Sequence, residues 1–138
     1  MNAVAIDLDG ALGDTRRLWD DWLDDARRRF RVDTDALDAE LPNWPQLLAR
    51  FAEERAPVYF RPDAEASAAL RRLQAAGARI GVFTEAPEPL ARVALSQLGA
   101  TRRVETLETG PEALGRLLAR LGADARVVRT RAELLDLR

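Results

Sequence analysis

The 138-residue sequence contains neither cysteine nor histidine. Their absence excludes disulfides, thiol nucleophiles, zinc sites built from Cys and His, and Ser-His-Asp triads. Lysine is missing too, because all 21 basic residues are arginine. A Walker-type phosphate loop needs lysine, and the 8 glycines nowhere adopt the spacing of a dinucleotide-binding fingerprint. The common nucleotide-binding motifs are therefore excluded.

Long apolar runs and a strong net charge are also missing. The formal net charge is -2, and 47% of the residues are hydrophobic. This composition is typical of one folded globular domain, with room for a small insertion, and disfavours a nucleic-acid-binding protein. No apolar run approaches the length of a membrane span or a signal peptide. We therefore expect a cytoplasmic protein that binds neither membranes nor nucleic acid.

The most informative segment is a short apolar run that ends in two acids. Residues 3–6 are apolar and too few for a helix, which predicts a strand covered on both faces, as in a parallel sheet. Because side chains alternate along a strand, Asp7 and Asp9 point to the same side where the strand leaves the sheet. Gly10 then allows a sharp turn. A plain Asx-Gly turn is the alternative interpretation.

The order of residues 7–12, Asp-Leu-Asp-Gly-Ala-Leu, resembles the first motif of the haloacid dehalogenase (HAD) superfamily. Ala11 stands where that motif usually has Thr or Val. The resemblance implies that Asp7 is a nucleophile that takes up a phosphoryl group, and that Asp9 protonates the leaving group and then activates water. It also implies that the loop at Gly10 binds phosphate. A carboxylate nucleophile suits this chemistry, because it divides one difficult displacement into two easier steps.

Strands and helices alternate along the rest of the chain. Periodicity and turn residues predict strands over 3–6, 78–84, 103–107 and 126–128, and helices over 16–31, 44–56, 63–76, 87–98, 110–121 and 131–137. Strand, helix and strand at this spacing imply a right-handed parallel crossover, and the polar 103–107 strand is expected at a sheet edge. We expect an α/β fold, namely a Rossmann-like three-layer α/β/α core with a parallel sheet of about four strands.

The predicted helices between 16 and 57 lie outside this core. We expect the core to comprise 1–15 and 58–138, and the insertion at 16–57 to form a small two-helix cap. The position of the cap resembles that in the phosphoglycolate-phosphatase-like branch, although this one is shorter. Trp19 and Trp22 recur at helical spacing and are interpreted as core residues, with a substrate-facing lid as the alternative.

The second predicted strand ends at Thr84. This matches the second motif of the superfamily, in which a Ser or Thr hydroxyl at a strand tip holds a phosphoryl oxygen. The resemblance therefore implies that Thr84, with Glu85 next to it, belongs to the phosphate-binding group.

Two later motifs of the superfamily are incomplete. The superfamily has a Lys after the third strand, commonly in Gly-Lys-Pro, whereas residues 109–111 here read Thr-Gly-Pro. Arg129 and Thr130 stand where an acid that binds Mg²⁺ is usual, and only Glu133 falls near the place of the second acid. Arg129 either binds phosphate oxygens in place of the missing Lys and metal, or faces solvent.

The resemblance implies Mg²⁺ as the cofactor. Its ligands would be Asp7, the backbone carbonyl of Asp9 and Glu133, and many waters would complete the coordination shell. Because one acid is missing and a guanidinium stands in its place, we expect weak metal binding.

Two functions of different classes fit these observations. The first is a HAD-like phosphatase that hydrolyses a small phosphorylated metabolite through an aspartyl-phosphate. The second is a catalytically impaired relative that keeps the fold and a phosphate site and serves as a binding or regulatory module. A phospho-receiver domain also uses a strand-tip Asp and a Thr, but it needs a Lys and is therefore excluded.

Overall fold

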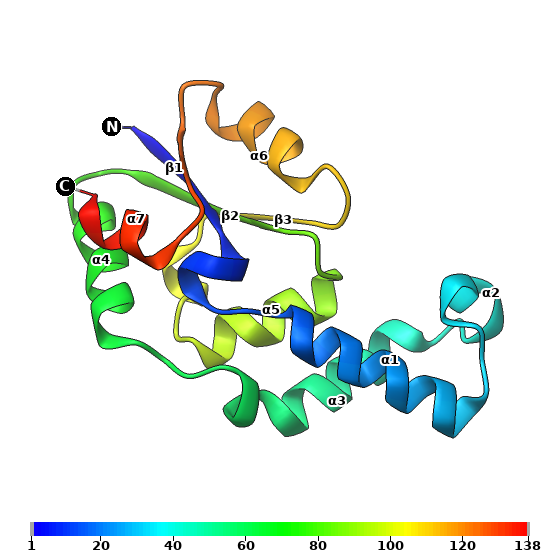
Figure 1. The fold of residues 1–138 in the computed structure, drawn as a ribbon. Coiled ribbons are helices and arrows are strands. Elements are labelled where there is room, and N and C mark those ends of the chain that lie inside the picture. The colour runs from blue at the N-terminus through cyan, green and yellow to red at the C-terminus, as the bar shows by residue number, and fades with distance from the viewer. Residues whose placement is uncertain (1, 138) are drawn as a thin grey trace.

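The computed structural model describes residues 2–137 and contains a parallel sheet of four strands. The strands are β1 (Ala3–Asp7), β2 (Arg79–Thr84), β3 (Thr106–Thr109) and β4 (Arg126–Val128). Their order is β3-β2-β1-β4, so β1 and β2 are central and β3 lies at an edge (Figure 1). This confirms the predicted parallel sheet and the edge position of the third strand.

Helices cover both faces of the sheet, which confirms the three-layer core. On one face, Val4 and Ile6 of β1 share the main hydrophobic core with α4 (Ala64–Ala75), α5 (Glu88–Gln97) and α7 (Arg131–Asp136). On the other face, Ala3, Ala5 and Phe83 form a smaller core with α6 (Ala113–Leu121). The two faces follow from the strict alternation of side chains along β1.

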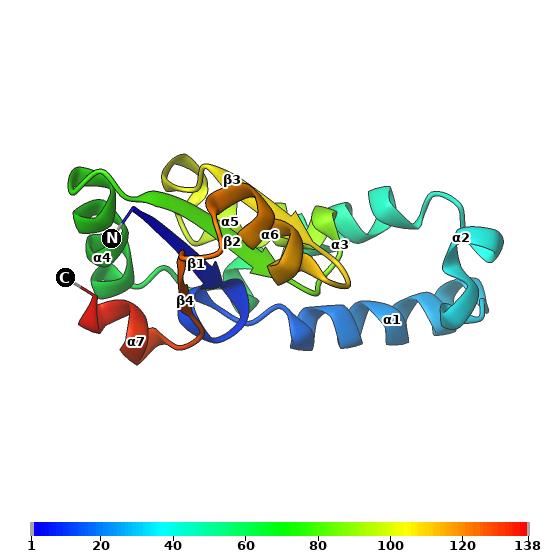
Figure 2. The same ribbon diagram turned by 90° about the horizontal axis from the view of Figure 1, so that it is seen from above.

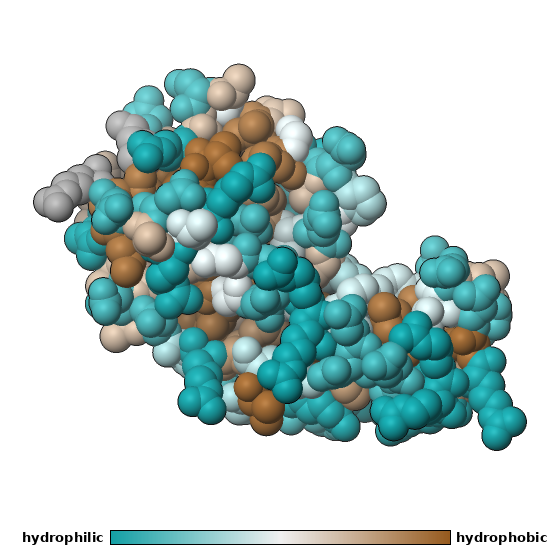
Figure 3. All heavy atoms as spheres, in the orientation of Figure 1, coloured by the Kyte–Doolittle hydropathy of each residue, from teal (hydrophilic) through white to brown (hydrophobic). Residues whose placement is uncertain are grey.

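The layer formed by α6 covers its face incompletely. Figures 1 and 2 show α6 on the side of the sheet opposite to α4, α5 and α7. Four apolar residues of the smaller core are only partly buried, namely Leu114, Leu118, Ala125 and Val127. Figure 3 accordingly shows apolar atoms at the surface beside α6.

The inserted segment forms a helical hairpin that extends away from the sheet (Figure 1). It consists of α1 (Arg16–Phe30), the short α2 (Leu37–Glu40) and α3 (Trp44–Tyr59). Trp22 is 2% exposed and packs between Trp19 and Trp44, with ring centroids 5.6 and 6.1 Å away. The core interpretation of Trp22 is therefore confirmed.

The insertion is packed onto the core. Leu48, Ala52 and Ala56 of α3 are buried in the same hydrophobic cluster as Leu90 and Ala94 of α5. The expected boundary at 57/58 lies inside α3. Within residues 2–137, no helix has the length and apolar character that crossing a membrane requires.

Several expected element ends were wrong. The prediction ended the second cap helix before Pro57, but α3 continues to Tyr59. A proline in the last turn removes one backbone donor, and the Phe60 N–H to Ala56 carbonyl bond at 2.8 Å still closes the helix. The third strand was placed at 103–107 but pairs with β2 over Thr106–Thr109, after a helical turn at Thr101–Arg103.

The start of α6 was also placed too early. The prediction began this helix at 110, whereas it begins at Ala113. Gly110 has a φ of 81° and Glu112 a φ of 62°, which are left-handed values incompatible with a right-handed helix. The other predicted strands and helices are confirmed to within about two residues at their ends, as is usual for element boundaries.

Candidate active site

The segment that follows β1 is a wide loop, Leu8–Leu12, which turns the chain at the carboxyl edge of the sheet. The loop is closed by a hydrogen bond from the Gly13 N–H to the Leu8 carbonyl at 2.9 Å. Gly10 has a φ of 116°, and a Cβ there would lie 2.5 Å from the Arg129 carbonyl oxygen. Only glycine fits this position. The Gly10 N–H donates to the Gly13 carbonyl at 2.8 Å, so it is already used within the loop.

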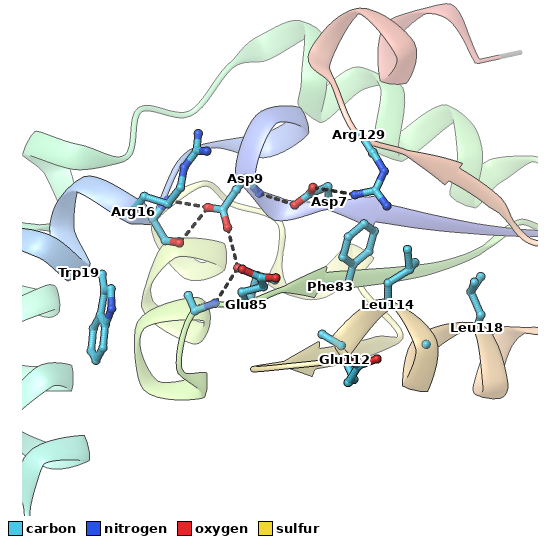
Figure 4. A pocket seen from close by; sticks show the side chains of 15 residues that line it. Asp7, Asp9, Arg16, Trp19, Phe83, Glu85, Glu112, Leu114, Leu118 and Arg129 are labelled. Carbon is cyan, nitrogen blue, oxygen red and sulfur yellow. Dashed lines mark hydrogen bonds and ion pairs between the residues drawn. The ribbon is translucent and has the colours of Figure 1, made fainter. Parts of the chain in front are cut away.

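Asp7 is the last residue of β1, and its carboxylate lines a pocket of about 740 Å³. Oδ1 accepts a hydrogen bond from the Asp9 N–H at 3.0 Å. Oδ2 lies 3.7 Å from Nη1 of Arg129 (Figure 4). Within the described part of the chain, Oδ2 accepts no hydrogen bond, so this oxygen is available to a ligand in the pocket.

Asp9 is held from two sides by buried threonines. Its Oδ1 accepts bonds from the Thr15 N–H at 2.7 Å and the Thr15 hydroxyl at 2.8 Å. Its Oδ2 accepts a bond from the Thr84 hydroxyl at 2.7 Å. Thr15 and Thr84 are each 1% exposed, so these contacts are shielded from water. Asp7, Asp9 and Thr84 therefore meet at the edge of the sheet, as the sequence predicted.

Thr84 has a different immediate partner from the predicted one. It was expected to hold a phosphoryl oxygen, but its hydroxyl donates to Asp9 and accepts from the Ala86 N–H at 3.1 Å. Thr15, the residue before α1, also holds Asp9 through its hydroxyl, a role that the sequence did not predict. Nothing in the sequence distinguishes this threonine from an ordinary capping residue.

Burial raises the pKa of Asp7 above its ordinary value. The Asp9 N–H bond opposes this increase, the negative charge of Asp9 adds to it, and the cations Arg129 and Arg16 oppose it. The net direction is upward because removing a carboxylate from water disfavours its charged form.

The walls of the pocket combine cations with apolar groups. Arg16 and Arg129 lie on opposite sides of the two aspartates (Figure 4). Arg16 forms a two-pronged ion pair with Asp14, at 2.9 and 2.8 Å, and this hydrogen-bonded partner lowers the pKa of Asp14. The apolar part of the lining consists mainly of Trp19, Phe83, Leu114 and Leu118, and the exposed acids Glu85 and Glu112 also line the pocket.

Glu133 is not brought into this pocket. It is exposed in the first turn of α7, where its N–H donates to the Thr130 hydroxyl at 3.1 Å and its carboxylate accepts from that hydroxyl at 3.2 Å. Within residues 2–137, no group of three acidic side chains lies close enough to hold a metal ion. Of the predicted Mg²⁺ ligands, Asp7 and Asp9 therefore lie at the pocket without Glu133, and two acids beside the guanidinium of Arg129 do not fit a magnesium site.

Arg131 is a residue of the site region that the sequence did not reveal. Its Nε donates to the Ala11 carbonyl at 2.7 Å, and its Nη2 donates to the Leu12 carbonyl at 3.1 Å. Its Nη1 lies 3.0 Å from the carboxylate of Asp63, the residue that caps α4. One guanidinium thus ties the end of the loop after β1 to the start of α4. Its position in the first turn of a helix resembles that of any solvated arginine.

No model of a known protein family matches the sequence, and no curated protein matches it. Solved structures do match. A HAD phosphatase from Thermococcus onnurineus superposes with a TM-score of 0.61 at 19% identity, over 94% of this chain and 77% of the other. A protein from Thermotoga maritima assigned as a beta-phosphoglucomutase superposes with a TM-score of 0.55 at 19% identity, over 98% of this chain and 80% of the other. The chain therefore has the HAD-like fold that the motifs indicated.

Proposed function

We propose that the protein is a phosphomonoester hydrolase in which Asp7 takes up the phosphoryl group of a small phosphorylated metabolite. The observation that carries the proposal is that the two aspartates differ in how many hydrogen bonds they accept. Asp9 is fixed by three hydrogen bonds, whereas Asp7 presents an oxygen without a hydrogen bond to a pocket of about 740 Å³. The HAD-like fold supports this assignment.

The reaction proceeds in two balanced steps. Asp7 Oδ2 attacks the phosphorus atom, the bond from phosphorus to the leaving oxygen breaks, and this oxygen takes a proton from the Asp9 carboxyl group. Water then attacks the aspartyl-phosphate and gives its proton to the Asp9 carboxylate, while the bond between phosphorus and Asp7 breaks. Both acids return to their starting states.

The two threonines suit the changing protonation of Asp9. A hydroxyl donates to a carboxylate and can rotate to accept from a carboxyl group, so Thr15 and Thr84 can satisfy both forms. They also fix the direction of the Asp9 side chain, which keeps the proton donor beside the nucleophile. Arg16 and Arg129 supply positive charge for the phosphoryl oxygens.

The second candidate function is phosphate binding without turnover. It is favoured by one observation, namely that the guanidinium of Arg129 lies 3.7 Å from the proposed nucleophile, where it can weaken the reactivity of that oxygen. In this case the protein would serve as a binding or regulatory module on the same fold.

Turnover of p-nitrophenyl phosphate by the wild type and by Asp7→Asn tests the proposal. Removal of the nucleophile should reduce turnover by about 10³-fold or more. Asp20→Asn, a substitution on the exposed face of α1, is the matched control and should keep wild-type turnover. Undiminished activity of Asp7→Asn would contradict the proposal. Absence of turnover in the wild type, together with formation of a beryllofluoride adduct on Asp7, would select the second candidate.

A further inference from the structure

We infer that the guanidinium of Arg129 occupies the place of a metal ion, so that the protein binds a phosphate group without a divalent cation. This inference rests on the location of the proposed site at Asp7. It adds that an arginine side chain, and not a bound metal ion, supplies the positive charge of that site.

Only one carboxylate oxygen of the two aspartates is free of hydrogen bonds, which disfavours the binding of a hard divalent cation. Mg²⁺ takes about six oxygen ligands, of which one or two are usually carboxylates and several are waters. Asp7 and Asp9 provide four carboxylate oxygens, and three of them already accept hydrogen bonds from Asp9, Thr15 and Thr84. Glu133, the further acid expected there, instead bonds to Thr130.

The remaining carboxylate oxygen, Oδ2 of Asp7, lies near a positive charge. Nη1 of Arg129 lies 3.7 Å from Asp7 Oδ2. A metal ion on this oxygen would be close to the guanidinium, and like charges at such a separation repel strongly in a partly shielded pocket. The arginine therefore both competes for the carboxylate and disfavours a second cation.

The backbone of Arg129 is held in this position, and its side chain extends over an aromatic ring toward Asp7. The residue follows Val128, which is fully buried and pairs with Ile6 of β1. Its carbonyl oxygen is so close to Gly10 that a Cβ there would lie 2.5 Å away. Its guanidinium lies over the Phe83 ring, 5.5 Å from the centroid. Figure 4 shows the side chain directed toward Asp7 rather than away from the pocket.

A guanidinium in this position can perform the binding role of a cation. Its donors form a planar fork that matches two oxygens of a phosphate group. The Arg129 side chain is 57% exposed, so its outer nitrogens remain accessible to a ligand. Arg16 provides a second guanidinium across the aspartates, although it is already paired with Asp14. The expected ligand is thus a phosphate dianion held between arginines.

Binding of inorganic phosphate, measured by calorimetry in excess EDTA and again in excess Mg²⁺, tests the inference. The wild type should bind phosphate with the same affinity in both buffers. Arg129→Ala should bind it about 10- to 100-fold more weakly, which corresponds to the loss of charge-assisted hydrogen bonds. Arg126→Ala, at an exposed arginine of β4, is the matched control and should bind like the wild type.

A second variant tests the exclusion of the metal directly. Arg129→Asp adds a carboxylate beside Asp7 and removes the guanidinium, so it should gain Mn²⁺ binding detectable by electron paramagnetic resonance. Arg126→Asp should not gain it, and the double variant Arg129→Asp with Asp7→Asn should lose it. Because Arg129 is largely exposed, these variants should fold, which circular dichroism checks. If Arg129→Asp fails to fold, the phosphate affinity of the wild type in EDTA and in Mg²⁺ still tests the inference.

The outcomes separate this inference from the proposed hydrolysis. Phosphate binding in EDTA without turnover of p-nitrophenyl phosphate would sustain the inference and overturn the proposed function. Turnover that depends on Mg²⁺ would sustain the function and overturn the inference. Wild-type binding of Mn²⁺ at Asp7, or failure to bind phosphate in EDTA, would also overturn it.

Discussion

Two aspartates separated by one residue differ because their surroundings differ. Three hydrogen bonds from Thr15 and Thr84 hold Asp9, whereas a single bond from the Asp9 N–H holds Asp7. A carboxylate with few donors is a better nucleophile, and one held in a fixed direction is a better proton carrier. The division of roles that we propose for the two acids therefore follows from their hydrogen bonds and needs no difference in residue type.

The raised pKa of Asp7 predicts a pH-dependent cost to stability. Burial favours the protonated form in the folded protein, so the folded state binds more protons than the unfolded state between the ordinary pKa of 3.8 and the raised pKa. The free energy of unfolding contributed by Asp7 therefore falls as the pH rises through this window and stays low above it. The stability of Asp7→Asn relative to the wild type should therefore increase as the pH rises above 3.8.

Urea denaturation of both proteins across this pH range measures the effect. Asp20→Asn, on the exposed face of α1, is the control for the loss of one negative charge. A difference in unfolding free energy between Asp7→Asn and the wild type that does not change with pH would show that burial of Asp7 has no net cost.

At the scale of elements, the loop after β1 depends on contacts from two other segments. Gly10 lies against the backbone of Arg129, just after β4. Arg131, the first residue of α7, donates to the carbonyls of Ala11 and Leu12 and pairs with Asp63. The position of Asp7 and Asp9 is thus determined partly by residues more than a hundred positions away in the chain.

Arg131→Met should loosen this loop. Methionine keeps an apolar stem of similar length but has no donor, so two loop carbonyls and the Asp63 carboxylate lose their partner. We expect a loss of about 1 to 3 kcal/mol in the free energy of unfolding. Arg126→Met, at an exposed position, should change it by less than about 0.5 kcal/mol. Chemical denaturation measures both, and equal effects of the two substitutions would show that the Arg131 contacts do not stabilise the loop.

The sequence predicts element ends where local signals determine them. The helix predicted over 63–76 is α4, which Asp63 caps and which Gly77, with a φ of 84°, follows. β3 was misplaced because an edge strand with few apolar residues takes its position from its partner. Gly81 pairs with Thr106 and Thr84 with Thr109, and this register is a property of β2 as much as of β3.

At the scale of the whole molecule, the parallel topology explains which site residues were predictable. Adjacent parallel strands place their carboxyl ends at one edge of the sheet, so Asp9 and Thr84 could be expected to meet although 75 residues separate them. Thr15 and Arg131 could not be found in this way. Their roles depend on the path of the loop between β1 and α1, which no periodic pattern encodes.

The two faces of the sheet are also unequally supported. In the described residues, the smaller core receives its buried helical side chains from α6 alone, namely Ala113, Leu117 and Leu121. α6 approaches the sheet closely because β2 has a glycine beneath it. A Cβ on Gly81 would lie 2.6 Å from a methyl group of Leu117 and 2.9 Å from one of Leu121. The close packing of α6 on β2 therefore requires that residue 81 has no Cβ.

Gly81→Ala and Leu117→Ala should consequently be coupled. Alone, Gly81→Ala overpacks the interface and should cost about 1 to 3 kcal/mol, and Leu117→Ala leaves a cavity and should cost about 2 to 5 kcal/mol. In the double variant the added methyl group enters the vacated space, so the cost should be below the sum by about 0.5 to 3 kcal/mol. Gly115→Ala, at an exposed position of α6 with no atom within 4 Å of the new Cβ, is the control and should be additive with Gly81→Ala. Additive effects of Gly81→Ala and Leu117→Ala would mean that α6 shifts as a rigid body, in which case Leu114 and the pocket wall that it forms would move with it.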